Sequence, residues 1–143
     1  MKRRFYQTLF ELNASPWIAT RLKRFAESDV SRHLIPSFAK VYDIAVEEAE
    51  QPLAAYPSLH AFFTRHLKPG ARTIDESSDT LVSPCDGKLS VIESISEDSR
   101  FEVKGQSYTL AELLGSQQEA RRYAGGTVVV LYLSPRDYHR VHT

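Results

Sequence analysis

The sequence is poor in cysteine, tryptophan and long apolar runs, and it has no excess of either charge. The single cysteine, Cys85, cannot form an internal disulfide, so the chain is compatible with a reducing compartment. Basic and acidic residues number 18 each, a formal net charge of 0, whereas nucleic-acid-binding domains normally carry a basic excess. No apolar run approaches the roughly 18 residues of a membrane-spanning helix. Neither a nucleic-acid partner nor a membrane span is therefore expected.

The residues that are present suffice for one folded domain. The length of 143 residues is that of about one domain, and a 42% hydrophobic share is too high for a disordered chain. The basic start, Met1–Arg4, precedes an apolar stretch that Gln7, Glu11 and Asn13 interrupt, so no secretory signal is expected. Residues 1–40 hold eight basic and three acidic residues, a net charge of +5, which leaves −5 for the rest.

Two amphipathic helices are predicted within the first 27 residues. Their apolar positions repeat with the spacing of one helix face, at Phe5, Leu9 and Leu12 and then at Ile18, Leu22 and Phe25. Ser15 is placed to cap the second helix, and Pro16 is placed at its first position, where its missing N–H has no effect.

Two further helices are predicted between residues 29 and 70. The third begins at Asp29 or Ser31 and holds Pro36 in its first turn. The fourth begins at Ser58 and ends at Pro69-Gly70. Their apolar sides consist of Leu34, Phe38, Val41 and Ala45 in the third, and of Leu59, Phe62, Phe63 and Leu67 in the fourth.

From about Leu81 the apolar period changes from 3.6 to 2, which indicates strands. Alternating stretches around Leu89 and Phe101 are separated by the polar turn Ser96–Ser99. The strongest strand pattern is Thr127–Leu133, which we expect to be buried on both faces. Helices followed by strands predict an α+β fold.

Two polar segments flank these strands, and the first is Ser-Pro-Cys-Asp-Gly at Ser83–Gly87. Pro84 stiffens the backbone and Gly87 permits an unusual turn, so Asp86 is expected to be held in a fixed place. An ordinary Asp-Gly turn is the alternative interpretation.

The second polar segment, Ser134–His142, directly follows the strongest predicted strand. Its two histidines, His139 and His142, are candidates for zinc ligands, for general bases or for plain loop residues. A zinc site needs more ligands than these two, and the sequence contains no Cys-x-x-Cys motif. No metal site is therefore expected.

Together the two segments resemble the phosphatidylserine decarboxylase family. The resemblance rests on Ser-Pro-Cys-Asp-Gly at Ser83–Gly87 and on Tyr-Leu-Ser-Pro-Arg-Asp-Tyr-His-Arg-Val-His at Tyr132–His142. Further similar segments are Leu59–Arg65, Arg72–Asp75 and Val103–Leu110. The matches are dense, keep the family's order and cover roughly residues 35–143.

The resemblance implies an enzyme that makes its own prosthetic group. In this family a serine hydroxyl attacks the carbonyl of the preceding glycine, and the resulting ester eliminates to leave a pyruvoyl group as cofactor. Because serine is a poor nucleophile without a base, the resemblance implies that His142 takes the serine proton and that Asp86 orients His142. The pyruvoyl carbonyl then condenses with the amine of phosphatidylserine, CO2 leaves and phosphatidylethanolamine is released. His139 is the candidate for handling the proton during decarboxylation.

The family's Gly-Ser cleavage point lies well past the second histidine, commonly as Leu-Gly-Ser-Thr, and no such segment follows His142 here. We therefore expect the amino-terminal part of a proenzyme, truncated before the processing site and inactive alone. The pyruvoyl-forming serine is expected beyond Thr143. The predicted strand Thr127–Leu133 is then expected to lack half of its sheet partners, and exposed strand edges invite aggregation.

One segment inside the chain copies the first three residues of that cleavage motif, Leu114-Gly115-Ser116. A structural interpretation competes with processing there. Thr109 and Glu112 fit a capping box with Gly115 at the end of its helix, and Ser116 fits a cap of the next helix. We expect this segment to be structural.

We expect the amino-terminal amphipathic helices to be followed by a mainly antiparallel, β-rich catalytic core that is incomplete in this chain. We expect residues 1–68 to form a helical, membrane-associating region and residues 69–143 to form the first part of the decarboxylase core. Basic amphipathic helices with aromatic residues bind anionic bilayers. The alternative is that the helices within residues 1–40 pack on the core.

The expected partners are phosphatidylserine, an anionic membrane surface and the carboxy-terminal pyruvoyl chain, with a homodimer left open. The expected location is peripheral, at the cytoplasmic face of the cell membrane. Two other functions stay open from sequence: a non-catalytic module that binds membrane surfaces, and a related decarboxylase with a different amine-bearing substrate.

Overall fold

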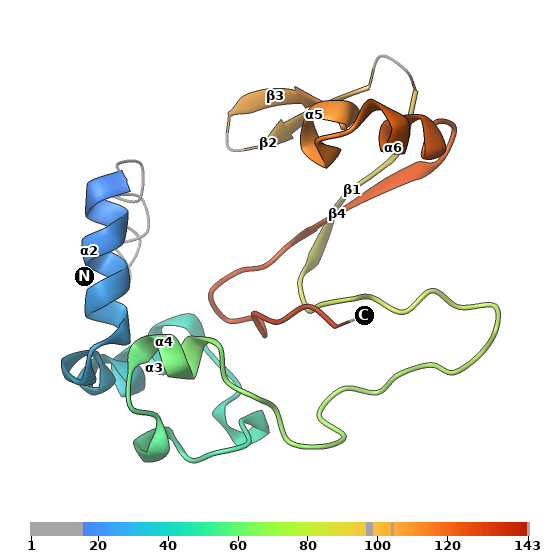
Figure 1. Ribbon diagram of the computed structural model, residues 1–143. Coiled ribbons are helices and arrows are strands. Elements are labelled where there is room, and N and C mark those ends of the chain that lie inside the picture. The colour runs from blue at the N-terminus through green and yellow to red at the C-terminus, as the bar shows by residue number, and fades with distance from the viewer. Residues whose placement is uncertain (1–15, 97–98, 104, 143) are drawn as a thin grey trace. The chain divides into compact units, whose positions relative to one another are not determined.

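The computed structural model describes residues 16–96, 99–103 and 105–142. The predicted first helix around Phe5 and the cap Ser15 lie outside the described residues. Helices precede antiparallel strands along the chain (Figure 1), which confirms the predicted α+β class. The chain divides into two compact units, the described residues of Met1–Gly87 with Leu133–Thr143, and Lys88–Tyr132. The functional boundary between residues 68 and 69 stays a prediction.

The first described helix, α2 (Pro16–Glu27), begins at the proline that the sequence placed at its first position. Trp17 is 63% exposed, and the Arg21 guanidinium carbon lies 4.0 Å from the centroid of its ring. Phe25, near the end of the helix, is also exposed. The helix therefore carries aromatic and basic side chains on its surface, and no described helix is long and apolar enough to cross a membrane.

The predicted third helix is divided into a 3-10 helix, η2 (Asp29–Leu34), and an α-helix, α3 (Ile35–Tyr42). Pro36 explains the division, because a proline inside an α-helix clashes with the carbonyl four residues earlier but is tolerated in the first turn. The helix ends at Tyr42, since Asp43 adopts a left-handed conformation with φ of 53°. Ala45, predicted within the helix, therefore lies beyond it.

The fourth helix, α4 (Leu59–Phe63), begins as predicted at Ser58, whose hydroxyl accepts the Ala61 N–H at 3.2 Å. It ends at Thr64, not at Pro69-Gly70 as predicted. The backbone beyond it pairs elsewhere, because Leu67 forms an antiparallel bridge with Ala49, beside the short 3-10 helix η3 (Val46–Glu48).

Helices α3 and α4 share one hydrophobic core, in which Phe38 and Phe62 are fully buried. The remaining core residues are Ile35, Ala39, Ile44, Tyr56 and Leu59, with Leu53 of η4 (Leu53–Ala55) packed against them. The buried hydroxyl of Ser31 fixes the start of α4, since it accepts the Leu59 N–H at 2.8 Å.

The second unit contains two antiparallel strand pairs. β1 (Lys88–Ser94) pairs with β4 (Thr127–Tyr132), and β2 (Arg100–Val103) pairs with β3 (Gln106–Thr109). Two short helices, α5 (Leu110–Leu114) and α6 (Gln117–Arg122), lie between β3 and β4 in sequence.

Strand β4 is not buried on both faces, contrary to the prediction. Val129, Val130 and Tyr132 are 48%, 42% and 60% exposed. The reason is its single neighbour, since within the described residues β4 bonds to β1 alone.

The segment Leu114-Gly115-Ser116 has the structural role that the sequence predicted. Thr109 and Glu112 form a reciprocal capping box at the start of α5, and Gly115 ends that helix with φ of 66°. The Ser116 hydroxyl caps α6 by accepting the Glu119 N–H at 3.3 Å.

Candidate active site

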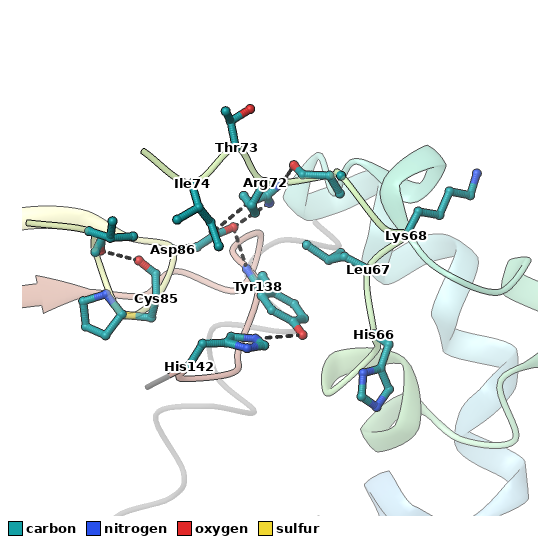
Figure 2. Close-up of a pocket in the computed structure, with 15 residues that line it drawn as sticks. His66, Leu67, Lys68, Arg72, Thr73, Ile74, Cys85, Asp86, Tyr138 and His142 are labelled. Atoms are coloured by element: carbon teal, nitrogen blue, oxygen red, sulfur yellow. Dashed lines mark hydrogen bonds and ion pairs between the residues drawn. The ribbon is translucent and has the colours of Figure 1, made fainter. Parts of the chain in front are cut away.

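The turn at Ser83–Gly87 presents Asp86 at the edge of a cavity (Figure 2). Gly87 has φ of 144°, a conformation that favours glycine, as the sequence predicted. The Ser83 hydroxyl donates a hydrogen bond to the Cys85 carbonyl at 2.7 Å, which tightens the turn. The Asp86 side chain is consequently held at a defined place and is only partly exposed.

Asp86 is bound on both carboxylate oxygens by one arginine, Arg72. The Arg72 Nε lies 2.8 Å from Oδ1, and Nη2 lies 2.6 Å from Oδ2. The Tyr138 backbone N–H also donates to Oδ2, at 3.3 Å. The hydrogen bonds from Arg72 hold the pKa of Asp86 below its ordinary value, against the opposing effect of partial burial. Asp86 is therefore an anion at neutral pH.

The remaining nitrogen of Arg72 connects this pair to a second carboxylate. Its Nη1 lies 2.9 Å from Oε2 of Glu48 and also donates to the Ala71 carbonyl. Glu48 is anchored through its backbone, because its carbonyl accepts the Lys68 N–H at 2.8 Å. Hydrogen bonds to Asp86, and secondarily to Glu48, raise the pKa of Arg72 above its ordinary value.

His142 is hydrogen-bonded to the same turn, but among the described residues no hydrogen bond joins it to Asp86. Its backbone N–H donates to the Pro84 carbonyl at 2.8 Å. Its imidazole Nε2 lies 3.2 Å from the phenol oxygen of the buried Tyr138, and the two rings stack with centroids 5.6 Å apart. Tyr138 therefore connects Asp86 to His142, through its N–H on one side and its phenol on the other. The direct orienting role of Asp86 stays a prediction.

His139 lies apart from this group, against helix α4. Its ring centroid is 4.0 Å from that of Phe63, and its Nε2 is 2.8 Å from the Ser134 carbonyl oxygen. A carbonyl only accepts hydrogen bonds, so Nε2 carries the hydrogen in this contact and Nδ1 of the neutral ring is the basic nitrogen. Next to it, Arg140 Nε donates to the Thr64 carbonyl at 2.9 Å.

The cavity has a volume of about 840 Å³, and Asp86 and His142 both line it. Arg72, Tyr138 and Cys85 contribute further walls, whereas His139 is not among the lining residues. The two candidate histidines thus occupy different surroundings. Within the part of the chain that the structure describes, no cluster of three or more histidine, cysteine, aspartate or glutamate side chains is placed to bind a metal ion.

The family model for phosphatidylserine decarboxylase matches residues 59–143. The chain belongs to the phosphatidylserine decarboxylase family. Over all 143 residues it is 45% identical to the "phosphatidylserine decarboxylase proenzyme" of Halalkalibacterium halodurans, and 43% and 42% identical to proteins of the same name from Bacillus cereus and Bacillus anthracis. It spans 55% of the length of each of these relatives.

Three residues of this candidate site were not predicted from the sequence: Arg72, Glu48 and Tyr138. Arg72 and Tyr138 lie within the segments that carry the family resemblance, but their residue types alone predict no role in the site. A loop arginine 14 positions before a turn aspartate has no recognisable local pattern. Glu48 lies outside those segments, and only the pairing of residues 48–50 with residues 66–68 brings it to the site.

Proposed function

We propose that this chain is the amino-terminal part of a phosphatidylserine decarboxylase proenzyme. The whole protein converts phosphatidylserine to phosphatidylethanolamine and CO2 in phospholipid biosynthesis. One observation carries the proposal: Asp86 and His142, 56 positions apart, line one cavity in a chain of this family. The chain alone is expected to be inactive, because the serine that forms the pyruvoyl group belongs to the remaining, carboxy-terminal part.

In the first reaction of this proposal His142 acts as the general base. A neutral imidazole accepts a proton readily near pH 7, and the serine needs such a base before its oxygen attacks the preceding glycine carbonyl. Asp86 is ionised, and it acts on His142 through Tyr138, whose N–H it binds. Asp86 thereby helps to position the imidazole that takes the proton.

The residues around the cavity fit a pyruvoyl group as cofactor, because they combine an imidazole with a guanidinium–carboxylate pair. Such a group would supply an electron-accepting carbonyl for the substrate amine and for the electrons left by the loss of CO2. His139 does not line this cavity, and its role in moving a proton during decarboxylation stays a proposal, for which Nδ1 is the basic nitrogen because Nε2 is held by the Ser134 carbonyl. The substrate carboxylate and phosphate are anionic, and Lys68 contributes a cation to the cavity wall.

The test joins residues 1–143 to the portion of the Halalkalibacterium halodurans proenzyme that the chain does not match. We expect this joined protein to cleave itself into two chains and to release CO2 from phosphatidylserine. Asp86→Asn and His142→Ala should block cleavage, whereas His139→Ala should cleave but turn over slowly. Mass spectrometry resolves the products, and a cleaved, pyruvoyl-bearing His142→Ala protein would refute the assignment. If the joined protein released CO2 only from another amine-bearing acid, phosphatidylserine would be refuted as its substrate.

We also propose peripheral attachment to the cytoplasmic face of the cell membrane, through contact with anionic phosphatidylserine. The support is the surface of α2, where Trp17 is 63% exposed beside Arg21 and Phe25 is partly exposed. Each basic group near an anionic surface contributes about 1 kcal/mol, and that attraction decays within a Debye length. Burial of the aromatic rings adds attraction that salt does not screen.

Vesicle sedimentation tests the attachment. The joined protein should bind phosphatidylserine-containing vesicles more strongly than neutral ones, and binding should weaken without vanishing as salt rises. Trp17→Ser should reduce the salt-resistant part, whereas Tyr123→Ser, which alters an exposed aromatic ring after α6, should not. Equal binding to both kinds of vesicle, or binding to neither, would refute membrane attachment through α2.

A further inference from the structure

The guanidinium of Arg72 uses all three of its nitrogens to connect two carboxylates. Nε and Nη2 form a two-pronged contact with Asp86, and Nη1 reaches Glu48 (Figure 2 shows the contact with Asp86). A planar guanidinium bound by two parallel hydrogen bonds permits one relative orientation of the two groups. The Asp86 carboxylate is therefore fixed in angle as well as in place.

We propose that Arg72, itself anchored by Glu48, is the positioning residue that fixes the Asp86 carboxylate for self-cleavage. This inference rests on the proposed function, since Asp86 is a participant in cleavage only there. Arg72 acts through Asp86 and is not assigned a direct contact with the reacting atoms.

The effect of Arg72 extends from Asp86 to His142 through Tyr138. Oδ2, the oxygen bound by Arg72 Nη2, also accepts the Tyr138 N–H at 3.3 Å. The Tyr138 phenol in turn lies 3.2 Å from His142 Nε2. Rotation of the Asp86 carboxylate away from its present orientation therefore removes the bond that holds Tyr138, which supports the imidazole.

The charges around Asp86 make Arg72 the group that keeps it ionised. Arg72 and the more distant Arg65 stabilise the anion, and His142 lines the same cavity. Glu48, on the far side of Arg72, is a second negative charge. Without the Arg72 guanidinium, the two carboxylates keep only the more distant Arg65 as a shared cation, and like charges favour protonation of one of them.

The three side chains of this ion-pair group are accessible to water, so their role in positioning Asp86 can be tested apart from the stability of the fold. The side chains of Arg72, Glu48 and Asp86 are 42%, 35% and 21% exposed. Ion pairs this accessible to water contribute little to the stability of a fold. Removal of Arg72 is therefore expected to leave the melting temperature almost unchanged while it slows cleavage.

The experiment measures the self-cleavage rate of the joined protein against pH, with the melting temperature of each variant. In Arg72→Gln the plateau rate falls, because the Asp86 carboxylate is no longer held in one orientation. The acid side of the profile also becomes steeper, because easier protonation of Asp86 is added to protonation of the base His142. Arg72→Lys keeps the positive charge but cannot form the two-pronged contact. Its plateau rate should therefore fall, while the acid side of its pH profile stays near that of the wild type.

The matched control is Arg122→Gln. Arg122 also pairs with a carboxylate, Glu119, at 3.1 Å, but it lies in the other unit on α6. This variant should cleave at the wild-type rate with the wild-type pH profile.

The outcomes distinguish this inference from the proposed function. A wild-type joined protein that does not cleave refutes the proposed function, and the role of Arg72 in cleavage with it. A wild-type protein that cleaves, with Arg72→Gln matching it in rate and pH profile, overturns this inference alone. Should Arg72→Gln fail to fold, Arg72→Lys and Glu48→Gln decide, since both are expected to slow the plateau and wild-type rates in both would refute the inference.

Discussion

Replacement of Phe63 by leucine should slow decarboxylation without slowing self-cleavage. Phe63 forms the ring contact of His139, with centroids 4.0 Å apart and ring planes inclined by 34°. Such aromatic pairs contribute roughly 0.5–1.5 kcal/mol beyond the burial of their surface. Loss of about 1 kcal/mol of the contact energy that orients His139 lowers the population of correctly placed imidazole by about fivefold. A comparable fall in turnover is expected if His139 moves the proton.

The loss should be partial, because a second contact of His139 survives the substitution. The Ser134 carbonyl oxygen still binds Nε2 at 2.8 Å and keeps Nδ1 as the basic nitrogen. Leucine also retains most of the apolar contact of residue 63 with the core ring of Phe38, 6.2 Å away between centroids. Phe63→Leu should therefore remain well above His139→Ala in turnover.

The assay is CO2 release from phosphatidylserine vesicles by the joined protein, expressed per mole of pyruvoyl group. Phe62→Leu is the matched control, since Phe62 is the fully buried neighbour on the same helix and its ring contacts are with Tyr56 and Arg65. The control should lower the melting temperature more but leave turnover per pyruvoyl group unchanged. Equal turnover in wild type and Phe63→Leu, or an equal fall in both variants, would refute the reasoning.

Three further outcomes follow from other contacts. Ser31→Ala should cost about 1–3 kcal/mol of unfolding free energy in urea titrations, because it leaves the buried Leu59 N–H without an acceptor. Ser116→Ala should leave cleavage unchanged on a denaturing gel and cost about 1 kcal/mol through the lost cap of α6. Because the folded pKa of Asp86 is lowered, its stabilising effect is present above its unfolded pKa of about 3.9 and is lost in stronger acid. Because the pair is exposed and contributes little, wild type and Arg72→Gln should differ only slightly in melting temperature at neutral pH, and even this small difference should vanish below about pH 4.

Elements defined by neighbouring residues could be predicted from the sequence. The start of α2 at Pro16, the cap Ser58 and the Thr109–Glu112 capping box all depend on groups within one helical turn. The left-handed end at Gly115 depends on the backbone freedom of one residue. Short-range geometry is visible in a sequence because the interacting groups are close along the chain.

Features that depend on distant residues could not be predicted in this way. The early end of α4 reflects the bridge between Leu67 and Ala49, which lie 18 positions apart. The strong apolar pattern of β4 indicated burial, but burial depends on what lies beside a strand and not on the strand itself. The partner of Asp86 was missed for the same reason, since many cations of the chain are equally plausible partners until the fold brings Arg72 beside it.

The segment Ser134–His142 contacts the rest of its own unit at two places, and this has a consequence for the two proposed reactions. Tyr138 and His142 contact the Asp86 turn, whereas His139 and Arg140 contact α4. Each attachment orients one histidine through bonds that the other does not share. Under the proposed function, changes at Arg72 should therefore act first on self-cleavage, and changes at Phe63 should act on decarboxylation. A single loop can serve two reactions because its successive side chains are held by different elements of the fold.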